Sequence, residues 1–235
     1  MIFVTGDIHG DINRIRALNS YCVSQKTSVN DYMIILGDVG INYYGDFRDE
    51  LRKNTMSEAP VTFLCIHGNH ENRPQNIGTY IKKEFCGGTV WYEKNHSNIL
   101  FLQDGETYEI EGLKFLAIGG AYSVDKFYRI SRNWTWFPDE QVSEKNREYI
   151  LKRVSGKSFD YVITHTCPLE WQPTELFLSQ IDQKLVDSSM EEWLSQVKNN
   201  IEFKEWFFGH YHGDKRYEDD DGIRELFFKN IKKIN

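Results

Sequence analysis

The amino-acid sequence opens with MIFVTGDIHG, residues 1–10, and this stretch largely decides the fold. The apolar, partly β-branched run Met1–Thr5 predicts a short buried strand. Gly6 ends the run, and Asp7 and His9 follow directly. In an open α/β sheet, ligands bind in the crevice outside the carboxyl ends of the strands. Two side chains that can bind a metal are therefore expected at that edge.

The same arrangement recurs at four later runs. These predicted strands are Tyr32–Leu36, Val61–Ile66 and residues 160–164 and 205–208. Polar side chains with metal-binding chemistry follow each of them: Asp38 after the second strand, Asn69 and His70 after the third, His165 after the fourth, and His210 and His212 after the fifth. Strands that alternate with helical patterns indicate a parallel α/β sheet.

Further elements follow from the same patterns. Apolar residues at three- and four-residue steps after Asp11 predict a helix. Pro138 is expected to open a helix from about Asp139 to Arg153, and Val186–Val197 indicates another helix. Short strands are predicted at residues 99–102, 106–110, 113–118, 215–218 and 223–228, with hairpin turns at Glu111-Gly112 and Asp221-Gly222.

Composition limits the class of protein. The chain has 235 residues, 40% of them hydrophobic, which excludes a disordered chain, and no repeat or linker divides it. We therefore expect a single domain over residues 1–235.

No apolar run reaches the roughly 20 residues that cross a bilayer, and Met1 begins no signal-peptide pattern, so we expect a cytoplasmic protein without a membrane partner. The net charge of −7 argues against broad nucleic-acid binding. The four cysteines lack C-x-x-C spacing, so we expect reduced thiols and no zinc knuckle.

The residue types at the strand ends define a metal chemistry. Carboxylate, imidazole and amide groups without a thiolate suit Mn²⁺, Fe, Zn²⁺ or Mg²⁺. A carboxylate that bridges two cations lets them lie about 3.5–4 Å apart, where they can hold a phosphate and lower the pKa of a water molecule. Each feature alone has an ordinary explanation, such as a turn, a helix cap or a buried structural histidine. Their occurrence in order at five strand ends favours a metal site.

The order Asp-x-His, Gly-Asp, Gly-Asn-His-Glu, His and Gly-His-x-His, from residue 7 to residue 212, resembles the calcineurin-like metallophosphoesterase superfamily. The resemblance implies a four-layer α/β/β/α sandwich of two mixed sheets and a dinuclear metal centre, which we expect to hold Mn²⁺ before Fe, Zn²⁺ or Mg²⁺. It implies the following ligands: Asp7, His9 and His212 for one metal, Asn69, His165 and His210 for the other, and Asp38 as the bridge. His70 would lie near the leaving-group oxygen as general acid or transition-state stabiliser, which suits a histidine near neutral pH.

The substrate class depends on finer motifs. Gly6–Gly10 and Gly68–Arg73 look like the Ser/Thr protein phosphatase branch, whose second motif carries an Asp-Arg pair. Asn42 stands where that arginine would be, and Gly209–His212 is typical of other branches, which include phosphodiesterases and nucleases. We expect a hydrolase that uses in-line attack of a metal-bridging hydroxide, with a phosphomonoester slightly favoured over a phosphodiester or nucleotide. A non-catalytic scaffold should have lost a ligand or His70, yet every position is filled.

Cationic residues suggest how a phosphorylated small molecule, nucleotide or phosphoprotein could be bound. Lys126, Arg129 and Arg132 stand among aromatic residues in Gly119–Trp136, which we expect to be a long loop. They could clamp a phosphate beside a stacked ring, or the loop could merely cover a small core. Arg73 is a second candidate, and its alternative is a salt bridge to the helix that it begins. No obligate protein partner is evident.

Three further positions have two interpretations each. Tyr43 or Tyr44 could face the substrate from a gating loop, or pack on the surface. Glu71 could cap a following helix, which we favour because helix N-termini favour carboxylates, or orient a catalytic histidine. His67 stands close enough to the third motif to be considered with it.

Overall fold

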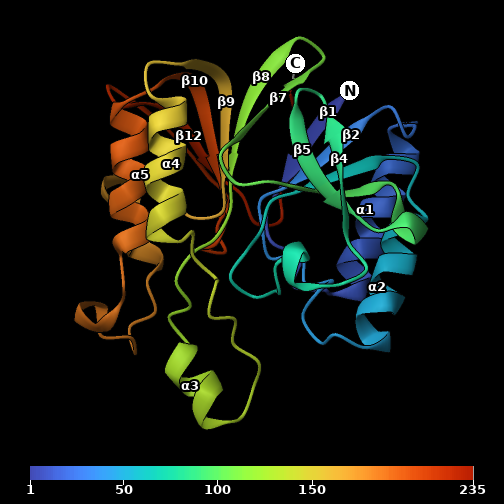
Figure 1. Cartoon of the computed structure of the whole chain (residues 1–235), viewed down its shortest axis with the longest axis horizontal. Helices are drawn as coiled ribbons and strands as arrows, with labels where there is room; N and C mark the ends of the chain where they lie inside the picture. Colours follow the sequence, from blue (N-terminus) through green and yellow to red (C-terminus); the bar gives the residue numbers. More distant parts are fainter. Residues whose placement is uncertain (235) are drawn as a thin grey trace.

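Two mixed β-sheets face each other at the centre of the computed structural model, which describes residues 1–234 (Figure 1). Helices α1 (Ile12–Ser24) and α2 (Phe47–Ser57) cover the outer face of the first sheet. Helices α4 (Glu144–Val154) and α5 (Ser189–Asn199) cover the outer face of the second. The expected four-layer α/β/β/α sandwich is confirmed.

The first sheet has seven strands in the order β13-β1-β2-β3-β6-β5-β4. Its centre, from β1 to β6, is parallel, and antiparallel strands flank it on both sides. The strands are β1 (Ile2–Thr5), β2 (Tyr32–Ile35), β3 (Thr62–Cys65), β4 (Ile81–Phe85), β5 (Gly88–Tyr92), β6 (Ile99–Leu102) and β13 (Lys232–Ile234). The strands that precede Asp7, Asp38 and Asn69 are therefore neighbours that run in the same direction.

The second sheet has six strands in the order β11-β12-β10-β9-β8-β7. Strands β8, β9, β10 and β12 are parallel to one another, and β7 and β11 pair antiparallel at the edges. The strands are β7 (Glu106–Ile110), β8 (Leu113–Ile118), β9 (Ser158–Thr164), β10 (Glu202–Phe208), β11 (Lys215–Asp219) and β12 (Gly222–Leu226). His165 and His210 thus follow two adjacent parallel strands.

Three apolar clusters hold the four layers together. Between the sheets, Phe115 and Phe207 of the second sheet belong to the same buried cluster as Ile34 and Leu64 of the first. Burial of a side chain of this size contributes about 1.5–3 kcal/mol. The other two clusters lie between each sheet and its helices. Because all the layers are packed in this way, the strand ends are held in a defined arrangement.

The helix after the first strand forms as its periodicity predicts. Ile15, Leu18 and Cys22 are its buried residues, and they pack against the first sheet. Asp11 caps the helix, because its side chain accepts a hydrogen bond from the backbone N–H of Asn13 at 2.9 Å. This turn connects the helix directly to the Asp7–His9 segment.

Two helix boundaries were predicted too early. The helix expected from Asp139 begins at Glu144, because Ser143 provides the N-cap and its hydroxyl accepts from the N–H of Asn146 at 3.4 Å. The helix expected from Val186 begins at Ser189. Before the first of these caps, Val142 packs into the buried cluster between the second sheet and its helices and does not belong to the helix.

Other elements were not predicted at all. The hairpin of β4 and β5 was missed, because the two adjacent lysines in Ile81–Phe85 obscure the alternation of an edge strand. The expected loop over residues 119–136 contains a short helix, α3 (Lys126–Ser131), at the tip of a projection (Figure 1). Five 3₁₀ turns complete the described residues: η1 (Pro74–Asn76), η2 (Lys94–His96), η3 (Leu169–Trp171), η4 (Thr174–Leu176) and η5 (Gln183–Leu185).

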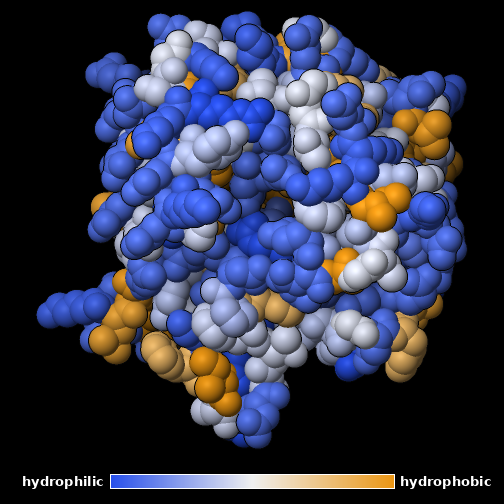
Figure 2. Space-filling model, in the orientation of Figure 1, coloured by the Kyte–Doolittle hydropathy of each residue, from blue (hydrophilic) through white to orange (hydrophobic). Residues whose placement is uncertain are grey.

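The surface is largely hydrophilic on the face shown in Figure 2, with hydrophobic residues scattered over it, some of them near the projection at the lower end. Phe127 and Trp134 of this projection are among the exposed large hydrophobic side chains. None of the helices within residues 1–234 is both long and apolar enough to pass through a bilayer.

Candidate metal centre

The strand ends converge as the sequence predicts. The turns that follow β1, β2 and β3 in the first sheet meet the turns that follow β9 and β10 in the second. Hydrogen bonds join these turns across the sheets: the N–H of His210 donates to Asp7 Oδ1 at 3.1 Å, and the ring Nδ1 of His165 faces the carbonyl of Leu36 at 2.7 Å. The structure therefore brings the predicted ligands of both halves of the chain into one cluster.

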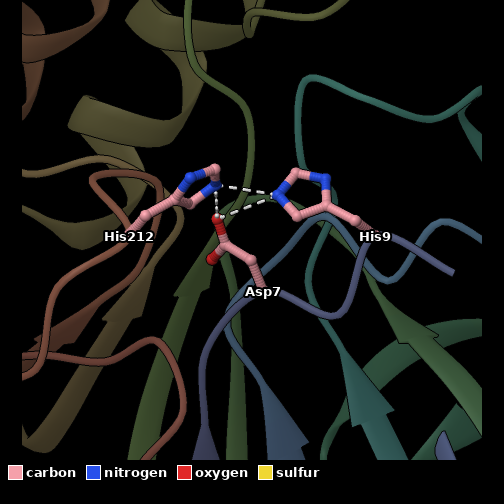
Figure 3. Close-up of side chains that lie close together, drawn as sticks. All are labelled: Asp7, His9 and His212. Atoms are coloured by element: carbon pink, nitrogen blue, oxygen red, sulfur yellow. Dashed lines mark hydrogen bonds and ion pairs between the residues drawn. The ribbon is translucent and has the colours of Figure 1, made fainter. Parts of the chain in front are cut away.

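The first group contains Asp7, His9 and His212, whose side chains point toward a common centre (Figure 3). Asp7 Oδ2 lies 3.3 Å from Nε2 of His212 and 3.7 Å from Nε2 of His9, and the two imidazole nitrogens are 2.8 Å apart. Asp7 is completely buried, and its Oδ2 has no hydrogen-bond partner within residues 1–234. A buried carboxylate oxygen without a donor is costly, and a cation between the three groups would satisfy it.

The second group contains Asn69, His165 and His210. Asn69 Oδ1 lies 2.9 Å from Nε2 of His165 and 3.1 Å from Nδ1 of His210. The amide is oriented by Ser123, whose Oγ accepts a hydrogen bond from Asn69 Nδ2 at 2.9 Å. The contact of His165 Nδ1 with the Leu36 carbonyl places a proton on Nδ1, so Nε2 is the ring nitrogen at which a cation would bind in place of a proton.

Asp38 lies between the two groups. Its Oδ1 accepts a hydrogen bond from the backbone N–H of His70 at 2.8 Å. Its Oδ2 lies 3.8 Å from Nε2 of His9 and 3.6 Å from Nε2 of His165. One oxygen atom of Asp38 therefore faces nitrogen donors of both groups, which is the position that a bridging carboxylate needs.

Charges in this cluster favour a bound cation. Burial opposes ionisation of Asp38, yet His165 and His70 hold the pKa of Asp38 well below its ordinary value. Burial also disfavours a charged His165, but Asp38 and Asp7 raise the pKa of His165 to about 9. Burial and the neighbouring His165 lower the pKa of His210 to about 3, so His210 is a neutral donor. Ionised carboxylates among imidazoles form an environment that attracts positive charge.

The backbone of the cluster is strained. His9, Asp38, His210 and His212 all have positive φ angles, of 54°, 47°, 69° and 52°. Residues with a Cβ atom rarely adopt this left-handed region, and strain of this kind collects at functional sites. Packing of the sheets must hold these four residues in the left-handed conformation, since their local backbone preferences oppose it.

Gly68 allows the second and third motifs to approach each other. A Cβ atom at this position would lie 2.0 Å from Asp38 Oδ1 and 2.2 Å from the backbone nitrogen of Asp38, far inside contact distance. A Gly68→Ala variant should therefore displace Asp38 and lower metal affinity by about 10–100-fold, measured as metal retained during dialysis against graded chelator. Gly78→Ala is the matched control, because nothing lies within 4 Å of its Cβ position. Equal metal retention in both variants would contradict the close approach.

Comparison with known families identifies the arrangement. The sequence model of the calcineurin-like phosphoesterase family matches residues 1–214, which include every residue of the cluster. The chain belongs to this family. It is accordingly a metallophosphoesterase, a hydrolase of phosphate esters. A search of curated proteins found no match.

Three solved structures resemble this metallophosphoesterase over nearly its whole length. TT1561 of Thermus thermophilus shares 13% identity with a TM-score of 0.56, over 97% of this chain and 89% of that chain. A novel archaeal phosphodiesterase shares 11% identity with a TM-score of 0.40, over 96% and 81%. Phosphopantetheinyl hydrolase (PptH) from Mycobacterium tuberculosis shares 11% identity with a TM-score of 0.46, over 97% and 89%. The first of these supports the common fold.

His70 lies at the edge of the phosphoesterase cluster, among charged groups. Nη2 of Arg129 lies 3.3 Å from His70 Nδ1 and 3.3 Å from the hydroxyl of Tyr43. A guanidinium can only donate, so Nδ1 accepts and neutral His70 carries its proton on Nε2. That nitrogen lies 3.9 Å from Asp125 Oδ1. Burial lowers the pKa of His70, and Asp38 partly opposes this effect.

Among the predicted substrate cations, Arg129 alone contacts the cluster. Its side chain is 2% exposed, and its Nη1 has no hydrogen-bond partner among residues 1–234. Lys126 packs against the ring of Trp136 at 4.1 Å, and Arg132 lies against Tyr128 at 5.4 Å. The sequence could not distinguish the three cations, because their directions depend on the short helix α3.

Arg73 is not brought to the cluster. Its guanidinium is buried, with Nη1 2.5 Å from Asp104 Oδ2 and Nε 2.6 Å from the carbonyl of Asp139. The salt bridge that we considered as its alternative is present, although its partner is Asp104 on the turn between β6 and β7 and not the helix expected after it. The phosphate-binding prediction for Arg73 is therefore withdrawn.

Glu71 is structural, but it is not a helix cap. It is completely buried, and its carboxylate accepts hydrogen bonds from the backbone N–H groups of Val39, Gly40 and Gly68 at 3.2–3.3 Å. It ties the second motif to the third, and burial raises its pKa to about 8. His67 is also buried, and its Nε2 contacts the carbonyl of Glu71 at 3.0 Å.

Two cavities meet at the cluster and share His70 and Asp125 in their linings. The first, of about 580 Å³, is polar and aromatic, and it includes Tyr43, Tyr44 and the arginines 48, 52 and 129. The second, of about 410 Å³, has a largely apolar wall. Asp125 and the two arginines of α2 were not predicted from the sequence. The four-residue spacing of Asp125 and Arg129 is a signal that could have paired them.

Proposed function

We propose that this phosphoesterase binds two divalent cations and uses them to hydrolyse a phosphate ester by in-line attack of a water-derived nucleophile. Asp7, His9 and His212 would hold one ion, Asn69, His165 and His210 the other, and Asp38 both. The position of Asp38 Oδ2, within 3.8 Å of nitrogen donors from both groups, is the observation that carries the proposal. The donor set of oxygen and imidazole nitrogen fits Mn²⁺, which we place before Fe, Zn²⁺ and Mg²⁺.

When bound, such a pair of cations supplies Lewis acidity, which neutralises charge on the phosphate oxygens and lowers the pKa of a water ligand. The residues of the chain provide the rest. The ionised Asp7 and Asp38 hold the positive charge at the centre of the crevice. The hydrogen bond from the His70 N–H to Asp38 Oδ1 leaves Oδ2 directed to the bridging position. This division of roles needs no covalent intermediate with the protein.

His70 and Arg129 are proposed to act on the organic side of the ester. With Nδ1 facing Arg129, the Nε2–H of His70 is free to donate a hydrogen bond to the leaving oxygen and stabilise the charge that develops there. Arg129 has an unpaired Nη1 and can donate to a non-bridging phosphate oxygen. Asp125 already lies 3.8 Å from Nε of Arg129, so Nη1 is the guanidinium nitrogen that remains for a substrate oxygen.

The substrate is a phosphorylated small molecule, a nucleotide or a phosphoprotein in this proposal. We place a phosphomonoester slightly ahead, because the first and third motifs look like those of protein phosphatases. A phosphodiester is the second candidate, and the two cavities that meet beside His70 favour it, since each could hold one ester group.

The proposal is tested on the purified chain after metal removal and reloading with Mn²⁺. We expect about two bound ions per chain and turnover of p-nitrophenyl phosphate, of bis(p-nitrophenyl) phosphate, or of both. Chelation should abolish turnover, and added Mn²⁺ should restore it. The ratio of kcat/KM for the two esters decides between monoester and diester. A folded protein that binds little metal and hydrolyses neither ester would support the non-catalytic scaffold instead.

A further inference from the structure

The apolar cavity beside the cluster contains features that the proposed chemistry does not use. It begins at Asp38, Asn69 and the two histidines of the last motif, and it extends along the segment between β9 and α5. Its volume of about 410 Å³ far exceeds that of a phosphate group and falls within the roughly 300–1,000 Å³ of small-molecule sites. The cavity therefore has room for an organic group attached to a phosphate at the metal centre.

The wall of this cavity is made of apolar side chains without a role in the core. They are Leu176, Phe177, Leu178, Ile181 and Val186. None of them belongs to the three buried clusters that hold the layers together. Leu178 is 53% exposed. Apolar side chains that line a concavity gain free energy when an apolar ligand covers them.

Local contacts hold this wall against the last metal-binding motif. The ring of Phe177 stacks on Tyr211 at 6.2 Å with an interplanar angle of 21°. The carboxylate of Glu175 pairs with Lys215 at 2.5 Å. A Cβ atom at Gly213 would lie 2.6 Å from Leu176, so the segment packs closely on the turn after β10. The cavity is thus a preformed feature next to the metal ligands.

Glu191 contributes a polar group to the lining of the same cavity. It lies in the first turn of α5 and is 4% exposed. Its Oε1 accepts a hydrogen bond from the hydroxyl of Thr166 at 2.7 Å, whereas its Oε2 has no partner within residues 1–234. A buried carboxyl oxygen without a donor is unfavourable, and a donor on a ligand would remove that penalty.

We propose that this cavity binds the organic group of the phosphate ester, and that this group is apolar and carries one hydrogen-bond donor for Glu191 Oε2. The inference rests on the proposed function, because the phosphate must lie at the metal centre for its organic group to enter. The substrate class is then a phosphate ester of an aryl or branched alkyl alcohol with a hydroxyl or amino substituent. The arginine-lined cavity on the other side of His70 is chemically different and would hold polar or anionic parts.

The test uses non-hydrolysable phosphonates as probes of the Mn²⁺-loaded full chain, with binding measured by calorimetry. Benzylphosphonate should bind about tenfold more tightly than methylphosphonate, because the ring is buried against the apolar wall. Leu178→Asn should remove most of that preference. Leu185→Asn is the matched control, because Leu185 is 73% exposed on the same segment and is not in the lining, and it should keep the preference. Equal binding of the two probes to the wild-type protein would overturn the inference.

A second pair of probes tests Glu191. The wild-type protein should bind 4-(aminomethyl)benzylphosphonate several-fold more tightly than 4-acetylbenzylphosphonate, which has an acceptor in place of the donor. Glu191→Gln can keep an oxygen for Thr166 and presents an N–H group at the other position, so it should reverse this order. An unchanged order in a variant that retains its metal ions and its unfolding midpoint would exclude Glu191 as the acceptor.

The two proposals fail in distinguishable ways. Turnover of aryl esters with equal binding of benzyl- and methylphosphonate would leave the phosphoesterase proposal standing and remove the cavity proposal. Selective binding of benzylphosphonate without turnover of any ester would keep the cavity and contradict the catalytic proposal.

Discussion

Replacement of Asp38 by asparagine should abolish nearly all turnover while the protein stays folded. Asp38 is the residue whose single oxygen faces both groups of ligands, and its pKa is held well below the ordinary value, so it carries a negative charge at the centre of the cluster. The neutral amide removes that charge, and its oxygen binds a cation more weakly. We expect kcat/KM to fall by about 10³-fold or more at saturating Mn²⁺, with metal content reduced from about two ions per chain.

A matched control distinguishes the specific effect of Asp38→Asn on turnover and metal content from the effect of removing any acidic residue. Asp160 lies near the start of β9, at the end of the strand opposite to His165, and pairs with Lys204. Asp160→Asn should leave metal content and kcat/KM within about twofold of wild type, because Asp160 lies outside the metal cluster and its pair with the exposed Lys204 contributes roughly 0–1 kcal/mol to stability. Far-ultraviolet circular dichroism and urea unfolding check the fold of both variants. Wild-type metal content in Asp38→Asn would contradict the bridging role.

Much of this site could be predicted from the sequence, because the ends of buried strands can be recognised from one amino-acid sequence alone. Short apolar runs followed by Gly-Asp or Gly-Asn-His segments locate ligands on a sheet edge even when the partners of each strand are unknown. Asp7 and His210 lie far apart in sequence, yet both follow such runs, and the structure joins them by a hydrogen bond of 3.1 Å. The order of the motifs then indicated the family and the four layers.

The remaining features could not be predicted, because they depend on side-chain directions that tertiary packing decides. Arg73 and Arg129 have the same charge and both stand near aromatic or catalytic motifs, but Asp104 binds one and His70 contacts the other. The left-handed backbone of His9 and Asp38 opposes local preference, so no propensity predicts it. The buried Oε2 of Glu191, which has no hydrogen-bond partner within residues 1–234, also depends on tertiary packing. The sequence shows only an acidic residue in the first turn of a helix.

Replacement of His70 by alanine should lower turnover while both metal ions stay bound. The contact that His70 makes with the bridging carboxylate is through its backbone N–H, which donates to Asp38 Oδ1 and which alanine retains. The imidazole contributes an Nε2–H that can donate a hydrogen bond to the leaving oxygen, and its loss should reduce kcat by about 10²–10⁴-fold, the range for side chains that assist the leaving group. Inductively coupled plasma mass spectrometry of the dialysed variant measures the metal, and steady-state kinetics measures kcat.

The effect of His70→Ala on esters with different leaving groups distinguishes two roles for His70. These are direct assistance to the leaving oxygen and a merely structural role. An ester with a poor leaving group needs a donor on its oxygen more than p-nitrophenyl phosphate does, so His70→Ala should slow an alkyl phosphate more strongly than the nitrophenyl ester. His96 provides the control, since it is a buried histidine between Ser57 and Glu50, outside the metal ligands. His96→Ala should change both esters alike. If His70→Ala instead lost metal as fully as His165→Ala, His70 would be a ligand, a role that its ring could take because one of its nitrogens lies within 4.8 Å of ligand atoms of His9 and Asp38.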